Sequence, residues 1–308
     1  MKHESMMVLA FALATAHARA DEAQSMRSAS IALGRWQADA VCGAPAKRKR
    51  VAFLIAGLVR TLPLARVHRS IAQYGIDAMG VDAAVFLELK SAGTGRLGAE
   101  RGDAGAAAAA IAYLRPASAR WDAAGGELHA ALRPCGPVPP ADAPTHWVVS
   151  QWLGLRNAFR EMVRHERRED VRFDAVVKLR GDDLWLGPAP VWCALDGLWA
   201  GAAAYANLAG GGDDSYVGGL DWWLAVPRAH ADRVFTMAGA YLNCSKANPQ
   251  HSEKWLAQTL RGTPGLALRR LRDLPRVIVY EERLAAKKFC AYVPDYLRPA
   301  CHKLRYPP

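Results

Sequence analysis

The chain has 308 residues, of which 51% are hydrophobic, and a formal net charge of +11. This is enough apolar material for one large α/β domain or two smaller ones. Beyond the N-terminus no run of about 18 apolar residues occurs, which argues against a membrane-spanning helix in the body of the chain. The positive charge suits a phosphate-bearing or acidic ligand. Basic and aromatic residues do not interleave as in nucleic-acid binders, so we expect no nucleic-acid partner.

Residues 1–20 have the pattern of a secretory signal peptide. Lys2 precedes a short apolar stretch, and the small residues Ala18 and Ala20 offer a cleavage site before the acidic Asp21. The alternative is an alanine-rich leader without a targeting role. On the first interpretation, the mature protein enters the secretory pathway and lies in the Golgi or endoplasmic reticulum lumen or is secreted.

The remaining chain predicts two regions. Residues 21–49 are polar and small, and we expect a flexible stem or tail. Residues 50–308 show no marked internal boundary and predict one domain, with a Gly/Ala-rich insertion at residues 91–110.

Cysteine usage agrees with an oxidising compartment. The six cysteines are Cys42, Cys135, Cys193, Cys244, Cys290 and Cys301. None forms a Cys-x-x-Cys pair, and the sequence does not choose among the possible disulfides; six buried free thiols are the alternative. Asn243-Cys-Ser245 is an N-glycosylation acceptor pattern, which matters only in a secreted chain.

The first structured segment predicts a βαβ unit. Residues 51–55 form a continuous apolar run, typical of a buried parallel strand. Leu64, Val67 and Ile71 recur at helical spacing, and Gly75 is a candidate helix stop. A second strand follows at residues 81–89, so we expect a parallel sheet.

Later segments continue this α/β pattern. The elements expected are a long amphipathic helix with Val148, Trp152, Leu155, Phe159 and Met162 on its inner face, a strand at residues 175–179, a glycine-rich loop at 210–219, a strand at 221–226, a helix that begins at Pro227, a helix at 253–260 and a strand at 276–280.

The strand at residues 175–179 ends in Arg180, Gly181, Asp182 and Asp183. In open α/β sheets, ligands bind at the carboxyl ends of strands. The two carboxylates are hard ligands for Mn²⁺ or Mg²⁺, and Arg180 is a candidate to contact a phosphate. The alternative is a turn that closes a hairpin.

A second candidate site is the loop after the first strand, which contains Gly57, Arg60 and Thr61. Backbone N–H groups before a helix can bind an anion, and Arg60 could hold a phosphate. The loop matches neither a dinucleotide fingerprint nor a Walker loop. An ordinary βα turn is the alternative.

Two acidic positions and several tryptophans complete the candidates. Asp214 lies in the glycine-rich loop, where it could line an acceptor pocket or act as a base, or simply be a solvated turn residue. Glu253 is a second candidate base, although the helix dipole favours an acid in a first helical turn regardless of function. Trp185, Trp222 and Trp223 could stack on sugar rings, but tryptophans at strand positions are more often part of a core.

The order of these motifs over residues 51–279 resembles glycosyltransferase-like proteins with a GT-A fold, which are related to bacterial lipopolysaccharide- and capsule-synthesis transferases. The motifs are strand–Gly-x-x-Arg-Thr, Phe-Asp-x-Val-Val-x-x-Arg-x-Asp, a loop Asp-Asp and a late Ser-Glu helix. The resemblance implies a mostly parallel, single-domain sheet and a nucleotide-sugar site at Gly57, Arg60 and Thr61. It matches Asp182, Asp214 and Glu253 to the family's acidic positions.

Two departures accompany the resemblance. Gly181 stands where the family usually has proline, and Asp182-Asp183 replaces the Asp-x-Asp element that binds metal in well-studied GT-A enzymes. From the resemblance we expect a glycosyltransferase that acts on a glycan or glycoprotein acceptor. The two departures leave open whether it uses a divalent cation. A non-catalytic carbohydrate-binding protein is one alternative. A sulfotransferase is another, but Leu62-Pro63 replaces the small hydroxyl and glycine residues of its phosphate loop.

Overall fold

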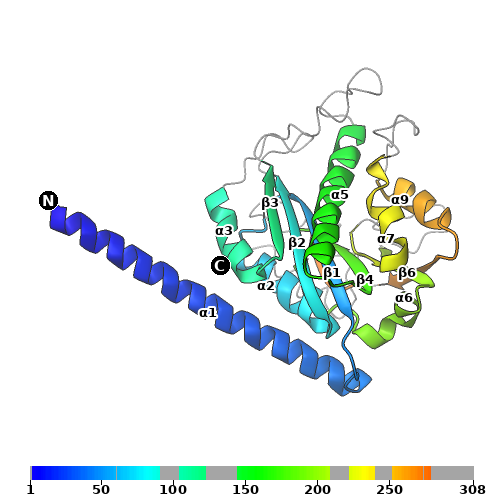
Figure 1. Cartoon of the computed structure of the whole chain (residues 1–308), viewed down its shortest axis with the longest axis horizontal. Coiled ribbons are helices and arrows are strands. Elements are labelled where there is room, and N and C mark those ends of the chain that lie inside the picture. The colour runs from blue at the N-terminus through cyan, green and yellow to red at the C-terminus, as the bar shows by residue number, and fades with distance from the viewer. Residues whose placement is uncertain are drawn as a thin grey trace.

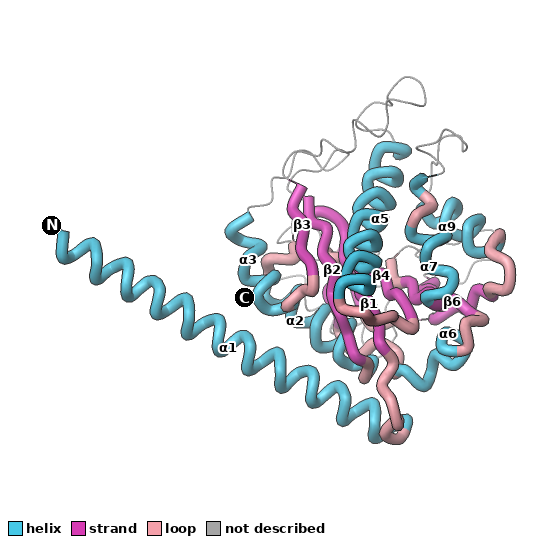
Figure 2. Tube along the Cα trace, in the orientation of Figure 1, coloured by secondary structure: helices cyan, strands magenta, loops and turns pink. Residues whose placement is uncertain are grey.

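The protein is built on a mixed, seven-stranded sheet with helices on both faces, as a computed structural model shows (Figures 1 and 2). The structure describes residues 2–59, 61–90, 104–122, 144–208, 222–239, 252–272 and 274–278. The strand order is β3-β2-β1-β4-β7-β6-β8. The pairs β3–β2, β2–β1, β1–β4 and β6–β8 are parallel, whereas β7 runs antiparallel to β4 and β6. The predicted α/β class with a mostly parallel sheet is confirmed.

The strands of this sheet are β1 (Arg50–Leu58), β2 (Asp82–Lys90), β3 (Ser118–Asp122), β4 (Ala175–Leu179), β6 (Ala203–Leu208), β7 (Leu224–Pro227) and β8 (Ala267–Arg272). A small antiparallel sheet pairs β5 (Asp183–Trp185) with β9 (Arg276–Ile278). The helices are α1 (Lys2–Cys42), α2 (Ala65–Ser70), α3 (Ala104–Leu114), α5 (Pro144–Arg168), α6 (Asp196–Trp199), α7 (Arg228–Phe235) and α9 (Ser252–Arg261). The π-helix η1 (Ile71–Ile76) and the 3₁₀ turns η2 (Asp77–Met79) and η4 (Trp192–Leu195) complete the set.

Two hydrophobic cores lie on the two faces of the sheet. Alternate residues of β1 point to opposite faces, because side chains alternate along a strand: Phe53 packs with α2, η1 and α3, and Leu54 packs with α5, α7 and α9. The predicted inner face of α5 is confirmed, since Trp152 and Phe159 are buried against the sheet. Figure 1 shows α5 crossing in front of β1 and β2.

The first βαβ unit forms as expected, with two differences in detail. β1 extends beyond the apolar run of residues 51–55, because its backbone pairs with β2 as far as Lys90. The helical segment also continues past Gly75 and ends at Gly80, which adopts a left-handed conformation with φ of 70°. Gly75 has a packing role instead: a Cβ there would lie 3.0 Å from Nε1 of Trp185.

Residues 21–42, expected to belong to a flexible stem or tail, lie in the helix α1, and the C-terminal half of this helix packs on the domain. Arg27 and Ser30 bind the buried carboxylate of Asp77, and Gly34 lies directly against the Asp77 backbone. Figure 1 shows the other end of α1 projecting away from the sheet. Within the described ranges, no helix has both the length and the apolar character needed to cross a membrane.

A disulfide joins Cys42, the last residue of α1, to Cys193 in η4. The pairing connects the N-terminal helix to the segment after β5, 151 residues later. It is consistent with the expected oxidising compartment, because such bonds persist where thiols are not kept reduced. The other four cysteines lie outside the described residues.

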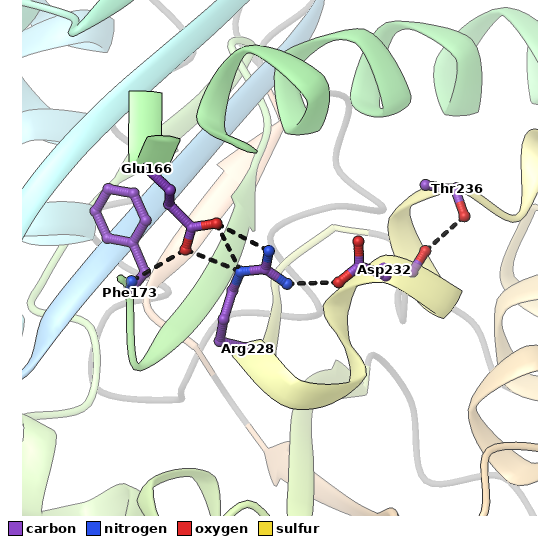
Figure 3. Close-up of polar contacts among 5 residues, drawn as sticks. All are labelled: Glu166, Phe173, Arg228, Asp232 and Thr236. Carbon is purple, nitrogen blue, oxygen red and sulfur yellow. Dashed lines mark hydrogen bonds and ion pairs between the residues drawn. The ribbon is translucent and has the colours of Figure 1, made fainter. Parts of the chain in front are cut away.

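A bidentate ion pair connects α5 to α7 below the start of β4 (Figure 3). Arg228 Nε donates to Glu166 Oε1 at 2.9 Å, and Nη2 donates to Oε2 at 2.8 Å. The same carboxylate accepts the backbone N–H of Phe173 at 3.1 Å. The other side of the guanidinium meets the exposed carboxylate of Asp232. One arginine thus ties together the end of α5, the entry to β4 and the first turn of α7.

Candidate functional site

The two loops that the sequence singled out meet at one edge of the sheet. From β1 the chain moves to β2 and β3 on one side, whereas β4 lies on the other side of β1. The boundary between β1 and β4 is therefore a topological switch point, and ligands of open α/β sheets bind beyond the carboxyl ends of strands at such a point. Both strands run parallel and end there, with Ile55 opposite Leu179.

The chain after β1 forms one side of this candidate site. Gly57 is the penultimate residue of β1 and has a φ of 143°, a conformation that side-chain-bearing residues rarely adopt. Thr61 is fully buried, and its Oγ1 has no hydrogen-bond partner among the residues that the structure describes. The helix α2 starts at Ala65, close to the predicted helical pattern from Leu64, so several residues separate its N-terminus from Gly57.

The segment after β4 forms the other side. A Cβ at Gly181 would lie 3.9 Å from Cβ of Leu62 and 3.7 Å from Cγ2 of Ile55, so the two loops are in close contact. These are ordinary van der Waals distances, so Gly181 lies next to the residues on either side of the first loop. Gly181 thus approaches Ile55 and Leu62, which lie on either side of the loop that contains Gly57 and Thr61.

Arg180 and Asp182 form a bidentate ion pair on this segment. Arg180 Nε donates to Oδ1 and Nη2 donates to Oδ2, each at 2.8 Å. The Arg180 side chain is 22% exposed, whereas that of Asp182 is 8% exposed. Arg180 is thus the more accessible partner, and both oxygens of Asp182 are engaged.

Asp183 is part of the core rather than an open ligand. It begins β5, its side chain has no exposed surface, and Oδ1 accepts from Arg276 Nη1 of β9 at 2.6 Å. Burial raises the pKa of Asp183 to about 6 against the opposing charge of Arg276. The neighbouring Asp182 raises this pKa further, whereas Arg180 and Lys178 lower it.

These contacts do not fit the expected metal site. A divalent cation needs several oxygen ligands that face a common point. Asp182 gives both oxygens to Arg180, and Asp183 is buried against Arg276. No group of three or more potential metal-binding side chains occurs in the part of the chain that the structure describes.

Charged residues that the sequence reading missed lie beside this edge. On β2, Glu88 accepts from Asn157 of α5 at 3.3 Å, and Lys90 Nζ donates to Oγ of Ser150 at 3.0 Å. Lys178 of β4 is only 2% exposed. A lysine within the apolar run of residues 175–179 was the available signal, because lysine is almost never fully buried without a partner.

The remaining predicted residues lie elsewhere or outside the described ranges. Arg60 and Asp214 belong to residues that the structure does not describe. Glu253 lies, partly buried, in the first turn of α9, which packs against α7 and β8. β8 is three strands away from β4 in the sheet. Trp185 and Trp223 are buried in the core, which agrees with the alternative that these tryptophans are core residues rather than stacking platforms for sugars.

An open hollow of about 340 Å³ lies at the opposite edge of the sheet, where β4 begins and β7 ends. Phe173, Trp199 and Arg228 contribute to its lining. It is distant from the switch point, and no residue that the sequence singled out for chemistry lines it. We therefore place the candidate site at the carboxyl edge of β1 and β4 rather than in this hollow.

Comparison with known proteins gives similarity in structure alone. No family model matches the chain, and no curated protein matches it. One similar solved structure is the mannosyltransferase PcManGT from Pyrobaculum calidifontis in complex with GDP-Man and Mn²⁺, with 13% identity, a TM-score of 0.40, and coverage of 94% of this chain and 80% of that chain. Another is mouse xyloside xylosyltransferase 1 in its apo form, with 12% identity, a TM-score of 0.37, and coverage of 80% and 94%. Scores this low do not carry an argument about function, so the site is interpreted from its own geometry.

Proposed function

We propose that the protein is a glycosyltransferase that moves a sugar from a nucleotide-sugar donor to a hydroxyl of a glycan or glycoprotein acceptor. The observation that carries this proposal is the close approach of Gly181 to Ile55 and Leu62, the residues that flank the first loop, at the β1–β4 switch point. In α/β sheets this is where nucleotides bind. The resemblance of the sequence motifs to GT-A-fold transferases points to the same class of ligand.

Within this proposal, residues of both loops bind the donor. Gly57 and Thr61 lie against the nucleotide, and Arg60 contributes from the same loop. Arg180 contacts the diphosphate, because a guanidinium binds phosphate oxygens through two parallel hydrogen bonds. These roles are supported by the position of the loops, the exposure of Arg180 and the unsatisfied hydroxyl of buried Thr61.

An inverting transfer also needs a base within hydrogen-bond reach of the acceptor hydroxyl. Asp214 and Glu253 are the proposed candidates, with Asp182 as the third acidic position of the motif set. Glu253 belongs to a helix that packs on α7 and β8. A retaining transfer would use no such base.

We also propose that the protein enters the secretory pathway, with residues 1–20 as its signal peptide. The Cys42–Cys193 disulfide supports an oxidising compartment. The domain proper would then start with the second half of α1, because Arg27, Ser30 and Gly34 already pack on the domain. Mass spectrometry of the secreted protein tests this through the N-terminal residue: a start at Asp21 is expected, and an intact Met1 contradicts it.

A thermal-shift panel of nucleotide sugars and nucleoside diphosphates tests the function. A ligand at one hundred times its Kd stabilises the folded state by about 2.7 kcal/mol, which raises Tm by several degrees. We expect one nucleotide class to do so with the wild type and to lose the effect in Arg60→Ala and Arg180→Ala. Arg164→Ala is the matched control, since Arg164 is 62% exposed on α5. Stabilisation by free glycans but by no nucleotide would favour the carbohydrate-binding alternative. Stabilisation by adenosine 3′,5′-bisphosphate alone would favour sulfate transfer.

A further inference from the structure

Five charged residues gather where β4 ends, and positive charge exceeds negative charge among them. The cations are Lys178, Arg180 and Arg276, and the carboxylates are Asp182 and Asp183. The charges of the other four all act on Asp183. Among the residues that the structure describes, this largely buried cluster holds three cations and two carboxylates.

This arrangement opposes a divalent cation for two physical reasons. A metal would have to displace the bidentate Arg180 from Asp182 and to expose Asp183, which has no accessible surface and is bound to Arg276. It would also bring two positive charges close to Lys178, Arg180 and Arg276, and like charges repel strongly where water is scarce. Both free-energy costs follow from contacts among the residues of the protein itself.

The same arrangement favours an anion at Arg180. The Arg180 side chain is the exposed member of the cluster, and its pair with Asp182 fixes the plane of the guanidinium before a ligand arrives. Lys178 and Arg276 are 2% and 4% exposed, so they act through their field rather than through direct contact. Preorganised charge of this kind stabilises an anion with little reorganisation.

We propose that Arg180, supported by Lys178 and Arg276, neutralises the diphosphate of the donor without a divalent metal ion, and that Asp182 is a positioning residue for Arg180 rather than a metal ligand. The inference rests on the proposed glycosyltransferase function. In the transfer, the bond between the anomeric carbon and the phosphate oxygen breaks and its electron pair goes to the diphosphate. A bond forms from the acceptor oxygen to the anomeric carbon, and the hydroxyl proton leaves to a base or to solvent. Arg180 stabilises the charge that develops on the diphosphate.

Calorimetric titration of the full chain with UDP, GDP and CDP tests this, each in EDTA and in Mn²⁺. We expect one diphosphate to bind with the same affinity, within about threefold, in both conditions. Arg180→Gln should weaken binding by about tenfold or more, since a charge-assisted hydrogen bond contributes about 1.5–3 kcal/mol. Arg164→Gln should leave the affinity unchanged, because Arg164 is an exposed residue of α5.

The variant Asp182→Asn distinguishes a carboxylate that positions Arg180 from a carboxylate that binds a metal ion. If Asp182 positions Arg180, the asparagine side chain of the variant still offers one oxygen to the guanidinium, and we expect diphosphate binding in EDTA within about threefold of the wild type. Binding that requires Mn²⁺ and is lost in Asp182→Asn overturns the inference and leaves the glycosyltransferase function standing. Binding of no diphosphate in either condition overturns the proposed function together with the inference. The comparison of EDTA with Mn²⁺ is made on the wild type, so this test of metal dependence remains valid even if a variant folds poorly.

Discussion

At the scale of single residues, buried charges are neutralised by partners that are far apart in the sequence. Asp183 and Arg276 are separated by 93 positions, and Glu166 and Arg228 by 62. Burying an ion costs several kcal/mol, which the partner offsets only while both members of the pair remain. These pairs are therefore the positions where one substitution has the largest effect on stability.

Arg228→Met should lower the free energy of unfolding by about 3 kcal/mol, because it leaves the Glu166 carboxylate, 10% exposed, without its counter-charge. Asp232→Asn is the matched control, since it removes the other carboxylate on the same guanidinium. Asp232 is 66% exposed, and we expect a loss below about 1 kcal/mol. Urea unfolding of both variants measures the two values, and equal losses would contradict the importance of the α5–α7 pair shown in Figure 3.

The candidate site could be predicted from the sequence only where it is local. The strand at residues 175–179 and the loop after it are contiguous, so a polar motif after an apolar run revealed Arg180 and Asp182. The roles of the two carboxylates could not be read in this way. Arg276 meets Asp183 only because β9 pairs with β5, and sequence spacing holds no information about that pairing.

At the scale of elements, the C-terminal half of α1 packs through a stripe of small residues. Gly34 and Ala38 lie about one helical turn apart on α1. Gly34 lies against the backbone of Asp77 in η2, and Ala38 lies against Gly80, the residue that follows η2. Small side chains allow two backbones to come close, so even one added methyl group has no space. Both the close packing of these small residues and the ion pair between Arg27 and Asp77 hold α1 against the domain.

Gly34→Ala tests this packing. In a helix alanine is ordinarily favoured over glycine by about 1 kcal/mol, but a Cβ at Gly34 would lie 2.3 Å from the backbone oxygen of Asp77. We expect a net loss of about 1–3 kcal/mol in the free energy of unfolding, as for other overpacked sites. Gly239→Ala is the control, because a Cβ there meets nothing within 4 Å. A Gly34→Ala protein as stable as the control would show that α1 does not pack tightly.

Elements with strong periodicity or long apolar runs were predicted, and so were α7, α9, β7 and β9, whereas other strands were missed. α5, β1, β2 and β4 have such patterns and were expected close to their observed positions. β6 and β8 were missed because their sequences, Ala-Ala-Tyr-Ala-Asn-Leu and Ala-Leu-Arg-Arg-Leu-Arg, have little strand propensity. They pair with each other in parallel, and β6 also pairs with β7, so tertiary pairing overrides the local preference.

At the scale of the whole molecule, the Cys42–Cys193 bond fixes the N-terminal helix to the middle of the chain. A disulfide that closes a long loop reduces the conformational freedom of the unfolded chain, and typical stabilisation is about 2–4 kcal/mol. Cys42→Ser with Cys193→Ser should lower the free energy of unfolding by this amount. Each single variant should cost as much as the double variant, since either one breaks the same bond. Additive losses would indicate that the two cysteines do not pair, as would the lack of a cross-linked peptide in a non-reducing digest.

The same bond makes a covalent ring of residues 42–193, and the ring contains β1, β2, β3, β4 and β5. Both loops of the β1–β4 edge therefore lie on it. A protease that cuts the ring once, for example between α3 and its neighbouring strands, opens it into a branched molecule without releasing a fragment. The two loops of the candidate site then stay covalently joined in one molecule after nicking, and reduction of the disulfide is needed to break that covalent connection.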